Sequence, residues 1–155
     1  LMVSVACDLI CKLFPENIHL DSTVKYFCRL IDMMQINNID ISELYKEYFI
    51  FELMLQKEMG YALDLTSCAV CSKSENLIYI SPKTGRAVCG IDGEAFNDKI
   101  FKIPKFILDF SNKADIDCLL NCAKISEHFL NKYYFRQYGK EITYMRNVLI
   151  NNIAN

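Results

Sequence analysis

Hydrophobic positions in the first sixty residues repeat with the period of helices that bury one face. Between residues 2 and 13 the apolar side chains fall on one side of a helical projection, and Pro15 predicts the end of that helix. The polar stretch at 16–20 is expected to form a loop. The chain therefore begins with a helix and a short connection.

Two further helices follow from the same pattern. Asp21 or Ser22 is expected to cap a second helix that continues to Met34, and Ser42 is expected to open a third that stops at Gly60. The middle of the third helix is apolar on nearly every side. Such a helix belongs in the centre of a bundle.

The pattern changes between residues 65 and 92. Residues 77–80 read as a short strand, the SPKTG segment at 81–85 reads as a turn, and 86–88 read as a return strand. This hairpin interrupts a helical domain. The expected organisation is a helical domain of residues 1–65 and 93–155 with a ribbon-like insertion at 66–92.

Helical periodicity returns after the hairpin. Pro104 is expected to start a helix over 105–110, a long helix is predicted from 115 to 138 with Gly139 as its stop, and a last helix covers 141–153. The fold class predicted is mainly α, a helical bundle with a small zinc-ribbon-like β-hairpin insertion.

Composition and charge limit the classes of partner that the chain is expected to bind. The 155 residues are 52% hydrophobic and 23% charged, enough for one domain with a core and a small satellite module. The net charge of −2 argues against a generic nucleic-acid binder. Residues 99–155, however, hold 9 basic and 5 acidic groups, so this part is the expected surface for an anionic partner.

No segment reads as a membrane span or a signal peptide. The apolar start of the chain is broken by Asp8 and Lys12 and lacks a basic leader. At least five of the eight cysteines lie in helical patterns, where a free cysteine behaves as a small hydrophobic residue. We therefore expect a protein of the reducing cytoplasm with free cysteines, and not a scaffold held by disulfides.

A cysteine pattern flanks the hairpin. Cys68 and Cys71 form a CxxC, Cys89 follows the return strand, and Asp92 occupies the position where a zinc ribbon has its fourth thiolate. Four ligands that converge tetrahedrally suit zinc, and a carboxylate can be one of them. The alternative is a hairpin held by packing alone, with thiols left over. Redox use of the CxxC is less favoured, because no βαβ pattern surrounds it.

Basic residues recur every four positions in the predicted long helix. Residues at this spacing lie nearly above one another on a helix, so they predict a basic ridge for phosphates or an acidic peptide. The alternative is an ordinary solvated face. The members are Lys124, His128, Lys132, Arg136 and Lys140.

Catalysis finds little support. The two histidines are His19, in a loop, and His128 on the ridge, and no glycine-rich phosphate loop is present. Glu52 is a lone acid in an apolar helix, and such a residue more often reaches the rim of the core or pairs with an arginine than acts as a base. The chain is not expected to be an enzyme.

The segment FELMLQKEMGYALDLTSCAVC, followed by YISPKTGRAVC, resembles the C-terminal domain of the bacterial RecO family, most closely its alphaproteobacterial members. The resemblance extends back to LFPEN and forward to the terminal helix. There GKEITYMR stands in place of a family segment that ends in Ser-Arg, so Arg146 matches the arginine and is expected to join the basic ridge.

This resemblance implies a helical domain with a ribbon-like insertion, preceded by an N-terminal OB-fold upstream of Leu1. It implies a mediator of DNA repair and homologous recombination at the nucleoid, which binds single- and double-stranded DNA and anneals strands. It also implies contacts with the acidic tail of single-strand-binding protein and with RecR, and help in loading RecA. Cys68, Cys71 and Cys89 match the family's zinc positions, whereas Asp92 departs from the fourth.

Two other functional classes stay open from the residues. One is a structural zinc adaptor that binds only protein. The other is a thiol enzyme that uses Cys68 or Cys71.

Overall fold

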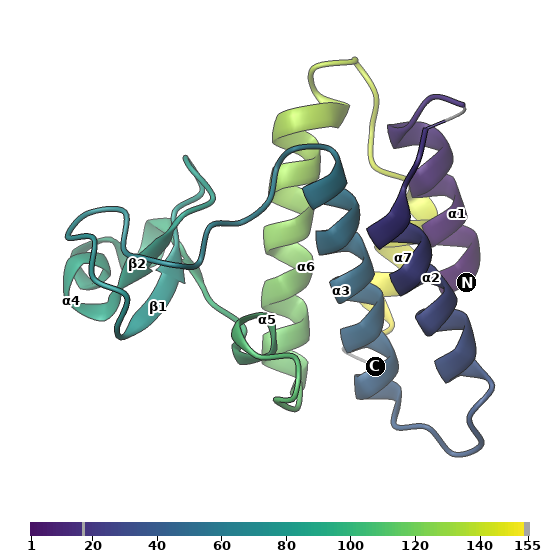
Figure 1. Ribbon diagram of the computed structural model, residues 1–155, viewed down its shortest axis with the longest axis horizontal. Coiled ribbons are helices and arrows are strands. Elements are labelled where there is room, and N and C mark those ends of the chain that lie inside the picture. The colour runs from purple at the N-terminus through teal and green to yellow at the C-terminus, as the bar shows by residue number, and fades with distance from the viewer. Residues whose placement is uncertain (17, 154–155) are drawn as a thin grey trace.

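The computed structural model describes residues 1–16 and 18–153. Position 17, within the expected loop at 16–20, and positions 154–155 lie outside the described residues. Figure 1 shows two parts, a helical body and a smaller β-containing finger that projects from one side of it. The helices of the body are α1 (Met2–Leu13), α2 (Asp21–Met34), α3 (Ile41–Glu58), α6 (Ile116–Leu130) and α7 (Tyr144–Asn151).

Helix α3 is the centre of the body, as its sequence predicts. It packs between α2 and α6 and also contacts α1. Tyr48, Phe49, Phe51 and Leu55 are fully buried along it, so apolar side chains cover nearly all of its circumference. Burial of each such side chain stabilises the fold by about 1.5–3 kcal/mol, and this packing holds the bundle together.

The start of α2 differs in detail from the sequence prediction. The N-cap residue is Leu20, and no side chain of its own caps the helix. Instead Glu58, at the end of α3, accepts hydrogen bonds from the backbone N–H groups of Ser22 and Thr23 and from the Thr23 hydroxyl. A distant carboxylate thus supplies the acceptor that a capping side chain normally provides. Asp21 and Ser22 are therefore not the cap.

The finger contains a three-stranded antiparallel sheet in the order β2-β1-β3. Strands β1 (Leu77–Ile80) and β2 (Ala87–Cys89) form the predicted hairpin, and β3 (Phe101–Lys102) adds to the free edge of β1. The sequence did not predict β3, because two residues carry no detectable alternation. This strand lies outside the expected insertion range of 66–92.

The sheet is anchored to the body through α6. Ile80, Ala87 and Ile103 from the finger pack on Ile125 and Phe129 of α6 in a small core. The turn at 81–85 closes with a hydrogen bond from Gly85 N–H to the Ser81 carbonyl, and Gly85 adopts a φ of 71° that favours glycine. The opposite end of the finger has a separate small core around the cysteines.

Short helical segments connect β2 to β3 within the finger and β3 to α6. They are α4 (Gly90–Gly93), the 3-10 helix η1 (Glu94–Lys99) and α5 (Lys105–Leu108). Helix α5 begins after Pro104 as predicted but ends at Leu108, two residues short of the prediction. Asp109 there is extended, with φ of −147°, which stops the helix.

The predicted long helix changes its winding before its end. Helix α6 runs to Leu130 and continues into η2 (Asn131–Phe135), a turn of π-helix. Gly139, with a φ of 61°, ends the segment, and Lys140 N–H donates to the Phe135 carbonyl. The last helix, α7, starts at Tyr144 rather than at residue 141. The fold prediction of a helical bundle with a small ribbon-like insertion is confirmed.

The described residues include no helix that is both long enough and apolar enough to cross a bilayer. All eight cysteines are free. Cys122 is buried in α6, whereas Cys7, Cys11 and Cys28 lie on exposed helix faces.

Candidate metal centre and basic surface

The two cysteine segments and Asp92 meet at the outer end of the finger. Cys68 and Cys71 come from the loop before β1, Cys89 ends β2, and Asp92 lies in α4. Asp92 Oδ2 accepts hydrogen bonds from the thiols of Cys68 at 3.2 Å and Cys89 at 3.1 Å. The Sγ atoms of Cys71 and Cys89 lie 3.8 Å apart. The structure therefore brings all four predicted residues together.

The Cys71–Cys89 distance matches a small tetrahedral cation, and the two sulfur–oxygen distances are shorter than such a cation requires. With zinc–sulfur bonds of about 2.3 Å, two thiolates are about 3.8 Å apart, and a thiolate and a carboxylate oxygen about 3.5 Å apart. The four donor atoms all lie within 4.8 Å of one another. Their number and spacing fit a metal ion, and three sulfurs with one oxygen form a donor set that zinc accepts.

Backbone groups prepare Cys68 as a ligand. Its Sγ accepts hydrogen bonds from the N–H groups of Val70 at 3.4 Å and Cys89 at 3.3 Å. Burial by itself raises the pKa of Cys68, but backbone N–H groups, including that of Cys71, outweigh burial, so this pKa is lowered. The thiolate form that a metal requires is thereby favoured at Cys68.

The pKa of Cys71 is shifted in the opposite direction. A hydrogen bond with Asp92 raises the pKa of this thiol to about 12. The thiols of Cys71, Cys89 and Cys68, acting as donors, lower the pKa of Asp92. Without a metal, Cys71 thus keeps its proton and Asp92 carries a negative charge. A divalent cation would displace this proton.

Two glycines allow α4 to approach β1 closely. A Cβ on Gly90 would lie 2.8 Å from Asn76 Nδ2 and 2.9 Å from Ile78 Cδ1, and a Cβ on Gly93 would lie 2.9 Å from Tyr79 Cε2. The segment CGIDG therefore holds Cys89 and Asp92 against the sheet.

The residues of the basic ridge predicted on α6 have different contacts in the structure. The Lys132 ammonium donates to the backbone carbonyls of Pro82 at 3.1 Å and Lys83 at 2.5 Å, and His128 Nε2 lies 2.9 Å from the Pro82 carbonyl. Both side chains hold the turn of the finger against the helical body. Lys132 therefore has a structural partner, and its charge is only partly available to a ligand.

The other three residues of the predicted ridge, Arg136, Lys140 and Lys124, each have different surroundings. The π-turn changes the spacing of the helix, since Arg136 N–H bonds to Asn131, five residues earlier. Arg136 is exposed, whereas the Lys140 ammonium lies 5.6 Å from the centre of the Tyr134 ring and 3.4 Å from its hydroxyl. Lys124 is exposed on the first half of α6. None of these three cations forms an ion pair within the described residues.

Lys124 lies on a groove that sequence reasoning missed. Lys102 from β3 and Lys105 from α5 line the same groove of about 460 Å³, together with Ile103, Pro104 and Leu120. Asp115 and Asp117 also line it, so lysines outnumber acids by one. The flanking of Pro104 by Lys102 and Lys105 was the available signal, but only the packing of α5 on α6 adds Lys124. We call these three lysines and their apolar floor the basic groove.

Comparison with known proteins identifies the family. The family model described as Recombination protein O C terminal matches residues 1–142. The chain belongs to the RecO family. This finding confirms the resemblance predicted from the segments around the CxxC.

RecO relatives are similar over most of this chain. It is 34% identical over 131 residues to the DNA repair protein RecO of Rickettsia bellii strain OSU 85-389, covering 84% of this chain and 52% of that protein. It is 33% identical over 128 residues to the RecO of Rickettsia africae, with 83% and 52% covered. The RecO of Bartonella bacilliformis is 37% identical over 101 residues, with 64% and 41% covered.

The chain spans about half the length of the curated RecO proteins it matches. No solved structure matches it.

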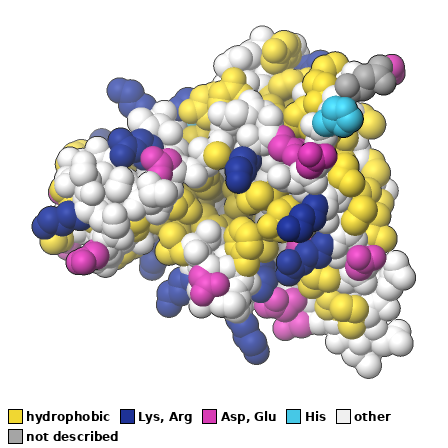
Figure 2. All heavy atoms as spheres, in the orientation of Figure 1, with side chains coloured by type: hydrophobic (Ala, Val, Ile, Leu, Met, Phe, Trp, Pro, Cys, Tyr) yellow, Lys and Arg dark blue, Asp and Glu magenta, His cyan; other side chains and the backbone are white. Residues whose placement is uncertain are grey.

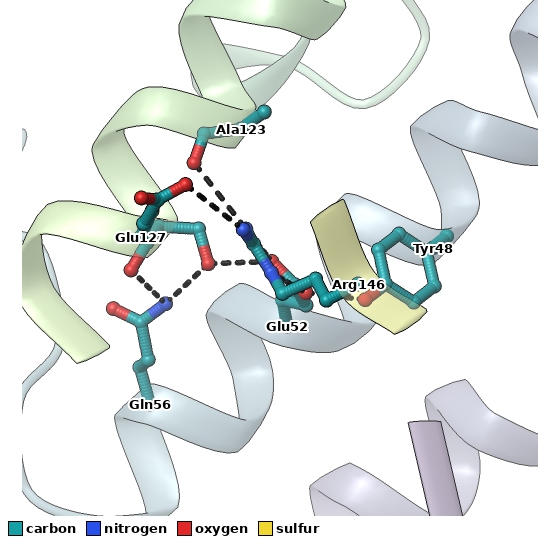
Figure 3. A network of polar contacts seen from close by, with 7 residues as sticks. Tyr48, Glu52, Gln56, Ala123, Glu127 and Arg146 are labelled. Carbon is teal, nitrogen blue, oxygen red and sulfur yellow. Dashed lines mark hydrogen bonds and ion pairs between the residues drawn. The ribbon is translucent and has the colours of Figure 1, made fainter. Parts of the chain in front are cut away.

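Arg146, expected to join the basic surface, does not lie on it in this RecO chain. Its side chain is fully buried, and its Nε and NH2 groups donate to the Glu52 carboxylate at 2.8 and 2.9 Å. The NH1 group lies 3.3 Å from Glu127, and NH2 also donates to the Ala123 carbonyl (Figure 3). The expectation that Arg146 joins the basic ridge is wrong, because its side chain is fully buried.

The buried pair explains the lone acid in α3. Burial raises the pKa of Glu52, but Arg146 and hydrogen bonds from Arg146, Ser126 and Tyr48 outweigh it, so the pKa is lowered. Glu52 therefore stays ionised in the core. Of the two alternatives to a catalytic base, the structure shows pairing with an arginine and not a position at the rim.

Proposed function

We propose that this chain is the part of a DNA-repair and recombination mediator that binds anionic partners through its basic groove. The exposed lysines 102, 105 and 124, which form no ion pair within the described residues, carry the proposal. Lysines that contact phosphates release counterions from nucleic acid, which drives binding. Membership of the RecO family, whose relatives are named DNA repair proteins, supports the same function.

The groove suits two anionic ligands. Phosphates of single- or double-stranded DNA would pair with the lysines. An acidic peptide that ends in apolar residues, such as the tail of single-strand-binding protein, would place carboxylates at the lysines and apolar side chains on Ile103, Pro104 and Leu120. Arg136 and Lys140, which form no ion pair in the described part of the chain, would extend the positive surface beyond η2.

Activities of the full-length protein are part of the proposal. They comprise strand annealing, contact with RecR and assistance in loading RecA, and an OB-fold upstream of Leu1 would share the DNA. The chain would bind and position these partners without changing their covalent structure.

We propose zinc for the cluster of Cys68, Cys71, Cys89 and Asp92, with a structural role. The bound ion would join the loop before β1 to α4 and so stabilise the outer end of the finger.

The test of the groove is a binding titration with a labelled single strand, a labelled duplex and an acidic peptide. The variant Lys105→Glu with Lys124→Glu should weaken binding of all three. For a single strand, it should also lower the slope of log K against log salt by roughly 0.7 for each phosphate that the variant no longer binds. The matched control is Lys25→Glu with Lys99→Glu, two exposed lysines outside the groove. Equal weakening in both double variants would reject the groove as the site.

A second candidate function is a structural zinc adaptor that binds only protein. The exposed apolar side chains next to the cysteines favour it, because Val70 is 68% and Ile91 is 80% exposed. Such residues are common in protein interfaces. The adaptor would be favoured if the zinc-loaded full-length protein does not bind DNA, and if the double variant Val70→Ser with Ile91→Ser no longer binds a protein partner that the wild type binds.

A further inference from the structure

An apolar pocket separate from the metal cluster and the basic groove lies between the end of α3, the segment 61–65 and α5. Its volume is about 200 Å³. Figure 2 shows hydrophobic side chains gathered on this face, between the finger and the helical body. Its apolar lining consists mainly of Leu53, Met54, Leu63, Leu65, Ile107 and Phe110.

One polar side chain in the lining of this pocket has an oxygen without a hydrogen-bond partner among the described residues. Gln56 lines the pocket and is 3% exposed, and its Oε1 accepts no hydrogen bond from the described residues. Its Nε2 donates to Ser126 Oγ at 2.8 Å and to the Ser126 carbonyl, and Ser126 Oγ donates to Glu52. These contacts determine which end of the amide is the nitrogen. Figure 3 shows the Gln56 oxygen turned away from this network.

A buried acceptor without a donor is costly, so the occupant of this pocket should bring an N–H group to Gln56. The pocket is small and Gln56 is buried. The donor must therefore lie on the part of the ligand that enters, not on a backbone that stays at the mouth.

Aromatic rings supply a flat wall. Tyr61 lines the pocket, is 37% exposed, and stacks on Tyr133 with ring centres 4.2 Å apart and planes 2° from parallel. Tyr133 in turn lies nearly parallel to Phe129, with 5.9 Å between ring centres. A planar ligand on Tyr61 would extend this column of rings.

A cation lies at the same pocket. Lys57 is part of the lining, is exposed, and forms no ion pair within the described residues. The occupant should therefore combine a planar ring that carries an N–H group with a nearby negative charge.

We propose that this pocket binds one unpaired base of a single-stranded nucleic acid. The base lies against Tyr61, its ring edge donates an N–H to Gln56 Oε1, and its phosphate pairs with Lys57. Every nucleobase has an N–H donor on its Watson–Crick edge, and a duplex hides that edge, so the site selects single strands. An aliphatic or phenyl side chain of a peptide brings no such donor. The proposal rests on the proposed function in DNA binding.

The experiment compares two labelled oligonucleotides of one length, an ordinary single strand and an abasic strand with the same phosphates. The 155-residue chain should bind the ordinary strand roughly 5- to 100-fold more tightly, the range expected when one base stacks on an aromatic ring. Tyr61→Leu and Gln56→Met should each reduce this preference toward one, while Tyr61→Phe should keep it. Tyr144→Leu is the matched control, since Tyr144 is 80% exposed and lies on α7, outside the pocket.

The outcomes separate this proposal from the proposed function. If the wild-type chain binds the ordinary and the abasic strand equally well, the base site is overturned but the basic groove is not. If it binds neither strand, both the base site and the proposed function in DNA binding are overturned. A base preference that survives Tyr61→Leu and Gln56→Met also overturns the base site. If the chain binds both strands equally well and binds an acidic peptide in a way that depends on Tyr61, the peptide occupies the pocket and the base site is overturned. Circular dichroism and urea unfolding of each variant show that its fold is retained.

Discussion

Arg146 and Glu52, 94 residues apart in the sequence, form a two-pronged ion pair in the centre of the helical body. Both side chains are fully buried. The pair joins α7 to α3, and Ser126, Tyr48 and the Ala123 carbonyl complete the hydrogen bonds around it. A short terminal helix is thus attached to the core by a charge as well as by apolar contacts.

Removal of the arginine should therefore be strongly destabilising. Arg146→Met leaves the Glu52 carboxylate buried without its counter-charge, and we expect the free energy of unfolding to fall by about 3–5 kcal/mol. The double variant Glu52→Leu with Arg146→Met removes both charges and should recover most of that stability. Urea unfolding measures both changes. A decrease below about 1 kcal/mol for Arg146→Met would contradict the role given to the pair.

Glu47 should respond to pH in the opposite way to an acid in a good ion pair. It is 1% exposed on α3, and Arg29 Nε lies 2.9 Å from its Oε1 without hydrogen-bond alignment. Burial raises its pKa above the ordinary 4.5, although Arg29 and Lys46 lower it. The folded state then binds this proton more tightly than the unfolded state, so ionised Glu47 costs stability once the pH exceeds its folded pKa.

Glu47→Gln should accordingly stabilise the chain at pH 7, by on the order of 1 kcal/mol. The gain should shrink as the pH falls toward the ordinary pKa value of 4.5 and vanish well below it, where the carboxyl is protonated in both states. Urea unfolding of the wild type and the variant at several pH values tests this. A gain that is the same at pH 4 and pH 7 would exclude titration of Glu47 as its cause.

Replacement of Asp92 should change zinc affinity in a defined order. Asp92→Cys supplies a fourth thiolate and should bind zinc more tightly than the wild type, and Asp92→Ala less tightly. Free zinc at 100 times Kd should stabilise the folded state by about 2.7 kcal/mol. Competition with a coloured chelator gives the affinities, and thermal unfolding gives the stabilisation. If zinc leaves the melting curves of both the wild type and Asp92→Cys unchanged, the proposed metal centre is rejected.

Gly93→Ala should destabilise the finger through a steric clash. Its φ of −90° suits any residue, but a Cβ would lie 2.9 Å from Tyr79 Cε2. We expect a cost of about 1–3 kcal/mol, typical of overpacking. Combination with Tyr79→Leu should relieve it, and hydrogen exchange at β1 and β2 reports the destabilisation locally. An equal cost in the presence of Tyr79→Leu would show that the clash is not the reason.

Local patterns predicted much of this fold. The apolar face of α1, the all-round apolar middle of α3 and the turn at 81–85 each depend on neighbours within a few residues, and the structure confirms them. The cluster of three cysteines and Asp92 was also predictable, because a hairpin brings residues at its base together whatever surrounds it.

Other features depended on contacts between distant segments. Strand β3 needs the edge of β1, the cap of α2 needs Glu58, and the basic groove needs α5 packed on α6. The regular spacing of Lys124, Lys132 and Arg136 suggested one ridge, but the finger turn occupies Lys132 and the π-turn displaces Arg136.

By itself, the sequence determined the helical class, the hairpin insertion and the family, since each depends on the order of neighbouring residues. Only the tertiary structure decided which charges face solvent. Arg146 is buried against Glu52, and Lys132 donates a hydrogen bond to the turn of the finger. Lys102 and Lys105 lie in the same groove as Lys124. The physical reason is that the free energy of a charge depends on its burial and on partners from other segments, neither of which sequence spacing specifies.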